Sequence, residues 1–297
     1  MKLLLVVNPI SGGVDKEPFL AEAEILLKKY AINYRVFKTQ GTSDEERVAL
    51  ILNDFQPDKV ASVGGDGTTL FTGVALLKSK IPMGIIPLGS ANGMAEELGV
   101  NPIPMEALKD ILMSNRIENL DILKVNDTHF MTHIGDVGVN ANLVNSYEKD
   151  PNRGMATYAK YFLEELTRLQ PFPVKVIANS QEVLSTALMV GIGNARKYGT
   201  GVPLNINGNP MDGIFEIVII KNVNANSLIS AGLAKFDDSF FDNESSEVIQ
   251  TRFAIIEFDK PRLLQLDGEV LGRHQKLKIE IMPGGIQLIT HNTNPYL

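Results

Sequence analysis

Cysteine is absent from all 297 residues of the chain. Disulfides, thiolate metal ligands and a cysteine nucleophile are therefore excluded, and the composition fits a reducing compartment. Long apolar runs are absent too, since no segment approaches the roughly 20 apolar residues of a membrane-spanning helix. The apolar run Leu3 to Val7 is too short for a signal peptide and is predicted to be a buried strand. We expect a cytoplasmic protein without a transmembrane span.

An excess of basic residues is also lacking. Lys and Arg number 28 against 35 Asp and Glu, which gives a net charge of -7. Surfaces that bind nucleic acid need clustered Lys and Arg, so no nucleic-acid partner is expected. Hydrophobic residues make up 44% of the chain and charged residues 21%, as in a globular protein with a sizeable core.

The first third of the sequence alternates between predicted strands and helices. Strands are predicted at Lys2 to Val7, Tyr34 to Thr39, Lys59 to Val63 and Met83 to Ile86. Helices are predicted from Asp15 to about Tyr30, from Ser43 to about Phe55, and from Thr69 to about Ser79. This alternation indicates a Rossmann-like α/β domain, with a mainly parallel sheet covered by helices on both faces.

Short strands dominate from about residue 120 onward. They are predicted at Asp121 to Val125, Phe130 to Ile134, Val174 to Ala178, Ala187 to Gly191, Phe215 to Ile220, Ala254 to Phe258, Leu263 to Leu266, Lys276 to Ile281 and Ile286 to Thr290. Helices are few, and the clearest are predicted at about Thr157 to Leu169 and Ser227 to Lys235. We therefore expect a first domain over residues 1–120 and an all-β sandwich over residues 121–297. The last residues, about 285–297, can pack back on the first domain.

The segment Gly64-Gly65-Asp66-Gly67-Thr68 joins a predicted strand to a predicted helix. Free N–H groups at such a helix start form an anion site, and glycines let the backbone approach a phosphate. An aspartate would repel phosphate unless a divalent cation lies between them, so Asp66 is interpreted as a contact to Mg²⁺ or Mg-ATP. We expect Asp66→Asn to abolish turnover and to leave the melting temperature nearly unchanged.

Two further glycine- or asparagine-rich segments end predicted strands of the same sheet. They are Asn8-Pro9-Ile10-Ser11-Gly12-Gly13 and Pro87-Leu88-Gly89-Ser90-Ala91-Asn92-Gly93. Alone, either segment could be a simple turn. Three such loops on one sheet edge are typical of a nucleotide site. The P-loop, dinucleotide and protein-kinase motifs are all absent.

Asp267-Gly268-Glu269 places two carboxylates around a glycine in the second domain. A carboxylate can accept the proton of a hydroxyl that attacks a phosphate. Asp-Gly is also the commonest hairpin turn, and the residues alone leave both interpretations open.

Together these segments resemble the diacylglycerol-kinase catalytic-domain family, which includes bacterial lipid kinases and the sphingosine and ceramide kinases. The resemblance spans nearly the whole chain. Its elements are Asn8-Pro9-x-x-Gly12, Thr39, Gly64-Gly65-Asp66-Gly67-Thr68, Pro87-Leu88-Gly89-Ser90-Ala91-Asn92, Asn194-Ala195-x-x-Tyr198-Gly199-Thr200-Gly201, Met211-Asp212-Gly213-Ile214-Phe215 and Asp267-Gly268-Glu269.

The resemblance implies an ATP-dependent kinase that phosphorylates a hydroxyl of diacylglycerol or of a related lipid, such as a sphingoid base or phosphatidylglycerol. It places ATP between a Rossmann-like domain and a β-sandwich that binds the lipid substrate. Implied ATP contacts are Asn8, Pro9, Gly12, Thr39, Gly64, Gly65, Asp66, Gly67, Thr68, Ser90 and Asn92. Implied catalytic residues are Glu269 as proton acceptor, Asp267 and Asp66. Implied Mg²⁺ ligands are Asn209, Asp212 and Ile214, with Asp121 nearby.

The implied partner is a lipid at the membrane surface, reached by transient membrane association. A homodimer is one alternative for the oligomeric state. The implied biological setting is phospholipid and lipid metabolism.

Three positions depart from the family pattern. Leu70-Phe71 replaces Asn-Glu after G-G-D-G-T, Gly93 replaces an aspartate after Asn92, and Met211 replaces the first aspartate of D-D-G. These departures leave two alternatives open. One is an NAD kinase, because Gly64 to Leu70 fits that family's G-G-D-G-T-x-L locally. The other is a catalytically degenerate nucleotide-binding regulatory module.

Overall fold

The chain divides into two units, each described by itself. Unit 1 comprises Met1–Asp121 and Pro283–Leu297, and unit 2 comprises Ile122–Met282. The computed structural model describes residues 1–138, 161, 164, 168–197, 204–205, 208–222 and 245–297. Unit 1 is thus built from both ends of the chain.

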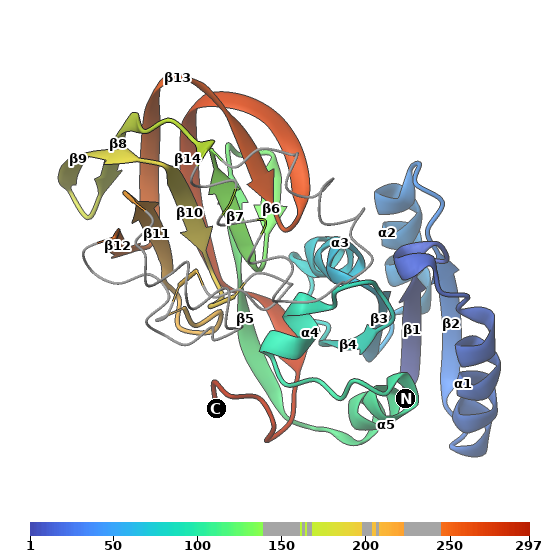
Figure 1. Ribbon diagram of the computed structural model, residues 1–297. Coiled ribbons are helices and arrows are strands. Elements are labelled where there is room, and N and C mark those ends of the chain that lie inside the picture. Colours follow the sequence, from blue (N-terminus) through green and yellow to red (C-terminus); the bar gives the residue numbers. More distant parts are fainter. Residues whose placement is uncertain (139–160, 162–163, 165–167, 198–203, 206–207, 223–244) are drawn as a thin grey trace. The chain divides into compact units, whose positions relative to one another are not determined.

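Parallel strands form the sheet of unit 1 (Figure 1). The strands are β1 (Lys2–Val7), β2 (Asn33–Lys38), β3 (Lys59–Gly64) and β4 (Met83–Pro87). Their order is β2-β1-β3-β4, and the end of β14 (Glu269–Ile289) pairs in parallel with β4 through Leu288 and Met83. The Rossmann-like α/β fold expected from the sequence is therefore confirmed.

Helices cover both faces of this sheet. They are α1 (Glu17–Lys29), α2 (Asp44–Phe55), α3 (Asp66–Leu76), α4 (Gly93–Glu97) and α5 (Pro104–Met113). Leu3, Leu5 and Val7 of β1 pack with apolar residues of α1 and α5, while α2 and α3 lie on the other face (Figure 1). Because strand side chains alternate in direction, one buried strand supplies both cores.

Unit 2 is a β-sandwich of mainly antiparallel strands. Its strands are β5 (Ile117–Val125, which begins in unit 1), β6 (His129–Met131), β7 (Ile134–Val137), β8 (Phe172–Ala178), β9 (Gln181–Ala187), β10 (Met189–Gly193), β11 (Phe215–Ile220), β12 (Ser246–Thr251), β13 (Phe253–Leu266) and most of β14. The first half of β13 pairs with β8 and its last residues pair with β7, with a register shift between Glu257 and Arg262. A single long strand therefore serves both sheets of the sandwich.

Several predicted elements differ in extent from the structure. The strand predicted at Phe130 to Ile134 is split into β6 and β7, and the pairs of strands predicted after Ala254 and after Lys276 are the single strands β13 and β14. The strand predicted at Ala187 to Gly191 spans the end of β9 and most of β10. Among the described elements, α4, α5, β9 and β12 were not predicted.

The helix predicted at Ser227 to Lys235 lies outside the described residues, and most of that predicted at Thr157 to Leu169 does too. Within the described ranges, no helix is long and apolar enough to cross a membrane.

Candidate functional site

Three loops meet at the carboxyl edge of the unit 1 sheet, because β1, β3 and β4 are parallel neighbours. Gly12 has φ +65°, and a Cβ there would lie 2.7 Å from the carbonyl carbon of Gly89. A Cβ on Gly89 would in turn lie 2.2 Å from Cα of Gly65. The backbones of the three loops therefore touch, and only glycine allows this approach.

Polar contacts also connect the loop after β1 to the loop after β3. The Gly65 N–H donates to Oγ of Ser11 at 3.0 Å. Nζ of Lys16 donates to the carbonyls of Ser11 (2.5 Å) and Val14 (2.6 Å), and the residue is only 2% exposed. Burial lowers the pKa of Lys16. Neither Ser11 nor Lys16 was singled out from the sequence, because a lysine at a helix start usually lies in solvent.

Asp66 connects the loop after β3 to α4. Its Oδ2 accepts the Gly93 N–H and its Oδ1 accepts the Met94 N–H, both at 2.8 Å. These are the first two residues of α4, so Asp66 caps the start of that helix from a different loop. The expectation that Asp66→Asn leaves stability unchanged is therefore replaced by an expected loss of stability.

The other predicted residues of the G-G-D-G-T segment lie at the start of α3, which Gly65 caps. Gly67 is exposed, whereas Thr68 is buried and its Oγ1 has no hydrogen-bond partner. A Cβ on Gly64 would lie 2.3 Å from that hydroxyl oxygen. The helix begins at Asp66 and not at Thr69, so Asp66, Gly67 and Thr68 lie in its first turn.

Asn92 stabilises its own loop. Its Oδ1 accepts the Gly89 N–H at 2.7 Å and its Nδ2 donates to the Gly89 carbonyl at 3.1 Å. Ser90, between them, is exposed. The loop thus presents Ser90 to solvent while Asn92 fixes its backbone.

The remaining predicted nucleotide contacts lie at the ends of β1 and β2. Oδ1 of Asn8 accepts the Ile10 N–H at 3.2 Å, and Pro9 is exposed. The Thr39 N–H donates to the Val7 carbonyl at 2.9 Å. Every predicted nucleotide contact in unit 1 therefore lies at the carboxyl edge of this sheet.

In unit 2, Asp267 and Gly268 form the two-residue turn between β13 and β14. Their φ values of +47° and +89° match a type I′ hairpin, in which Leu266 pairs with Glu269. Glu269 is exposed at the start of β14. The hairpin interpretation is thus correct, and the Glu269 side chain next to the turn is accessible to solvent.

The Asp267 carboxylate is held by the segment between β6 and β7. Oδ2 accepts the Thr132 N–H at 2.8 Å and the Thr132 hydroxyl at 3.3 Å, and Oδ1 accepts the His133 N–H at 3.0 Å. The carbonyl of Thr132 accepts Nδ2 of Asn194 at 2.8 Å. Asp267 therefore fixes the turn beside the start of the Asn194 loop, whose Tyr198 to Gly201 part lies outside the described residues.

The predicted metal ligands lie in one turn before β11. Oδ1 of Asn209 accepts the Met211 N–H and Oδ1 of Asp212 accepts the Ile214 N–H, both at 3.0 Å. Although Asp212 is exposed overall, burial raises the pKa of its carboxyl. In the described part of the chain, no group of three or more His, Cys, Asp or Glu could hold a metal. Asp121 belongs to unit 1, where its Oδ1 accepts the Gly284 N–H at 2.7 Å.

A buried polar network near this turn was not foreseen. Glu216, which is fully buried, accepts Nδ2 of Asn205 at 2.5 Å and Nε2 of Gln250 at 3.0 Å. Burial raises the pKa of Glu216. No sequence signal could identify it, because Glu216 follows an apolar residue in a strand and resembles an outward-facing position.

Comparisons with known proteins cover nearly the whole chain. The profile of the Diacylglycerol kinase catalytic domain matches residues 2–125, and that of the YegS C-terminal NAD kinase beta sandwich-like domain matches residues 135–290. A protein named "Probable lipid kinase YegS" from Escherichia fergusonii is 29% identical over 96% of this chain and 94% of its own length. A protein named "Diacylglycerol kinase" from Mycobacterium tuberculosis is 26% identical over 97% and 94%.

Solved structures show the same fold. A crystal structure of a diacylglycerol kinase from Bacillus anthracis str. Sterne has a TM-score of 0.74 at 22% identity, covering 99% of this chain and 98% of that one. A second crystal structure from the same organism has a TM-score of 0.80 at 24% identity, with the same coverage. The chain belongs to the diacylglycerol kinase catalytic-domain family with a YegS-type C-terminal sandwich, and it is a kinase that transfers phosphate to an alcohol group.

Proposed function

We propose that the chain transfers the γ-phosphate of ATP to a hydroxyl of diacylglycerol or of a related lipid, such as a sphingoid base or phosphatidylglycerol. Unit 1 holds the nucleotide and unit 2 receives the lipid. The contact of Gly12, Gly65 and Gly89 carries the proposal, because it leaves a side-chain-free backbone surface at the start of α3. Such a surface suits the phosphates of a nucleotide.

The phosphate site in this proposal is electrostatic. The 11-residue helix α3 directs its N-terminal N–H groups and its positive dipole end toward the loops. Exposed Ser90 and Gly67 flank the loops, and Thr68 supplies a buried hydroxyl without a partner. Lys16 places a cation among the carbonyls of the loop after β1.

Oxygen ligands suitable for Mg²⁺ are present in both units. Asp66 uses one lone pair on each carboxylate oxygen for α4, and the remaining lone pairs fit a contact to Mg-ATP. Asp212, with the carbonyl oxygens of Asn209 and Ile214, would hold a structural Mg²⁺, since hard oxygen donors match that ion. The Mg²⁺ of Mg-ATP, when bound, would neutralise charge on the transferred phosphate.

Glu269 is the general base in this proposal. Its carboxylate accepts the proton of the lipid hydroxyl while that oxygen forms a bond to the γ-phosphorus and the bond to ADP breaks. Glu269 is exposed, whereas both oxygens of Asp267 accept hydrogen bonds from Thr132 and His133. The proposal therefore makes Asp267 a positioning residue.

A matched pair of variants tests these roles. Glu269→Gln should lower kcat by about 10²–10⁴-fold, with ATP binding and melting temperature near the parent values. Asp267→Asn should lower the melting temperature, because an amide cannot accept N–H groups on both of its heavy atoms. Normal turnover by Glu269→Gln would show that the base is misassigned.

The acceptor is tested by a screen with labelled ATP against diacylglycerol, monoacylglycerol, sphingosine, ceramide, phosphatidylglycerol and NAD. We expect a phosphorylated lipid, and higher activity when the lipid is presented in vesicles or mixed micelles. Phosphorylation of NAD alone would overturn the lipid assignment. Nucleotide binding without turnover on any acceptor would indicate a binding module.

A further inference from the structure

Helix α4 is a single short helix fixed at both ends by other parts of unit 1. It spans only Gly93–Glu97, and a helix of this length is not stable alone. At its start, the N–H groups of Gly93 and Met94 donate to Asp66. The position of α4 and the position of Asp66 are therefore coupled through two hydrogen bonds.

The C-terminal tail, residues 290–297, holds the other end of α4. Gly99 ends the turn after α4 with φ +63°, and a Cβ there would lie 2.2 Å from the Thr293 carbonyl oxygen. Oγ1 of Thr293 donates to the Gly99 carbonyl at 2.8 Å. The hydroxyl of Tyr296 donates to the Glu97 carboxylate, and Glu97 is only 7% exposed. The tail thus packs against the turn after α4 through its backbone and contacts α4 itself through Tyr296.

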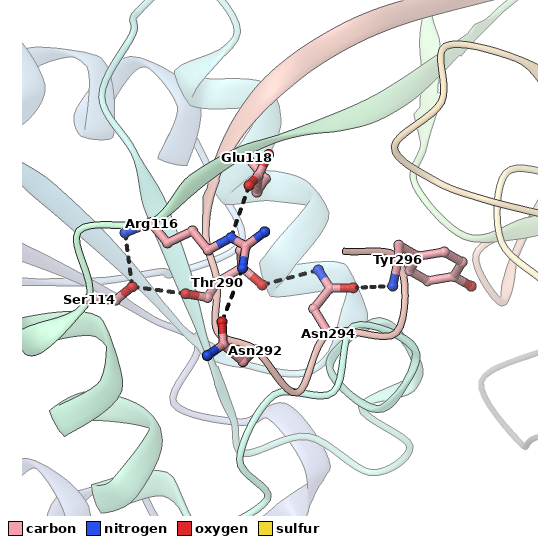
Figure 2. Close-up of polar contacts among 7 residues, drawn as sticks. All are labelled: Ser114, Arg116, Glu118, Thr290, Asn292, Asn294 and Tyr296. Atoms are coloured by element: carbon pink, nitrogen blue, oxygen red, sulfur yellow. Dashed lines mark hydrogen bonds and ion pairs between the residues drawn. The ribbon is translucent and has the colours of Figure 1, made fainter.

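The tail is itself held by hydrogen bonds to Ser114 and Arg116 and by bonds within the tail (Figure 2). Nδ2 of Asn294 donates to Oγ1 of Thr290 at 3.0 Å, and Oδ1 of Asn294 accepts the Tyr296 N–H at 3.0 Å. Ser114 donates to the Thr290 carbonyl at 2.9 Å, and Arg116 donates to Asn292 at 3.0 Å. Because these contacts fix the backbone on both sides of Asn294, Tyr296 is a fixed support for Glu97.

We propose that Tyr296 is a positioning residue for the nucleotide loop, acting through Glu97 and α4 on Asp66. All the contacts lie within unit 1 and run from the tail to the G-G-D-G-T segment. The expected effect of Tyr296 on nucleotide binding rests on the proposed nucleotide role of Asp66. The expected effect of Tyr296 on the position of α4 does not depend on that role.

The test is Tyr296→Phe in the full chain, which removes one hydroxyl and keeps the ring. The readouts are amide exchange at Gly93 and Met94 and the KM for Mg-ATP. We expect amide protection there to fall about fivefold to tenfold, the typical effect of one lost hydrogen bond to a buried carboxyl. The KM for Mg-ATP should rise by a similar factor while kcat stays close to the parent value, because Glu269 is untouched.

Two further variants separate positioning from general loss of stability. Glu97→Gln should change protection and KM less than Tyr296→Phe does, because its amide oxygen can still accept the Tyr296 hydroxyl. Tyr30→Phe, at an exposed tyrosine after α1, should change neither readout. Exchange at Leu5, inside β1, reports global opening and should not follow the change at Gly93.

Unchanged protection at Gly93 and Met94 in Tyr296→Phe would overturn the inference. Reduced protection with unchanged KM would confirm the mechanical coupling and refute its role in nucleotide binding. A chain without kinase activity would refute the proposed function, and the exchange data would still decide the coupling.

Discussion

Asp66 combines a structural role at the start of α4 with the proposed contact to Mg-ATP. Its two carboxylate oxygens accept two N–H groups of α4. In Asp66→Asn, only the amide oxygen can accept, and the NH₂ group faces an unpaired N–H. We expect the free energy of unfolding in urea to fall by about 1–3 kcal/mol, together with loss of ATP turnover.

Asp54→Asn is the matched control for this substitution. Asp54 is exposed in α2 and pairs with Arg35 at 2.5 Å, so its loss should change stability by less than about 0.5 kcal/mol. Equal stability of the two variants would mean that the bonds from Asp66 to α4 contribute nothing measurable.

At the scale of single residues, the sequence predicts which residues lie at the candidate site better than it predicts their hydrogen-bond partners. Glycine and asparagine after strands identified the three loops, because these residues are needed where backbones turn sharply. The bonds from Asp66 to Gly93 and from Ser11 to Gly65 were not predictable, since each joins segments that meet only in the folded sheet. Lys16 was missed for a different reason: a lysine beside a helix start usually lies in solvent, whereas here its ammonium group donates to the carbonyls of Ser11 and Val14 in its own loop.

Among the loops, Gly12 and Gly13 form a natural matched pair. Both have positive φ, +65° and +63°, but only a Cβ on Gly12 meets a neighbour, Gly89. Gly13→Ala should cost about 1–2 kcal/mol, the left-handed penalty alone. Gly12→Ala should cost more and should also weaken nucleotide binding, because the loops must separate. Denaturation measures the loss of stability, and titration with an ATP analogue measures the loss of nucleotide affinity. Equal losses of stability and of affinity in the two variants would contradict the argument that Gly12 packs against Gly89.

At the scale of elements, buried regular strands were predicted almost to the residue. Lys2–Val7 and Phe215–Ile220 agree at both ends, since continuous apolar runs indicate buried strands. The helix α4 was missed because its stability comes from tertiary contacts to Asp66 and Tyr296. The strand β12 was missed because it has few apolar side chains and its four central residues alternate between half-buried and exposed.

The buried Glu216 in β11 makes stability depend on pH. Burial raises its pKa, so the folded state binds a proton more readily than the unfolded state. Stability should then fall as pH rises from the ordinary glutamate pKa, about 4.3, toward the raised value. In Glu216→Gln this part of the fall should vanish, and rotation of the Asn205 amide, whose Oδ1 lacks a partner, can accommodate the new NH₂ group. Thermal melts of both proteins across this pH range, with a chelator present, measure the pH dependence of stability. If Glu216→Gln has the same pH profile as the parent, Glu216 does not cause the fall in stability.

At the scale of the molecule, unit 1 requires both ends of the chain. Ile289 lies in its core and Leu288 pairs with Met83 of β4. A fragment of residues 1–121 should therefore lack a cooperative thermal transition. Joining residues 283–297 to it by a short Gly-Ser linker should restore one, since Asp121 already contacts Gly284. A cooperative transition in the 1–121 fragment alone would show that the last strand is dispensable.

Because unit 1 is made of two separate segments of the chain, it also affects the order in which the two units can fold during synthesis on the ribosome. Domains generally fold from the N-terminus as the chain is made. Here unit 1 begins first but is completed only after unit 2 has been synthesised, because the part of β14 that pairs with β4 follows unit 2 in the sequence. All of unit 2 emerges while β4 is still an open sheet edge, which is a hazard for pairing with other nascent chains. A ribosome that stops before residue 283 would release a chain that contains unit 2 but leaves β4 of unit 1 without its β14 neighbour.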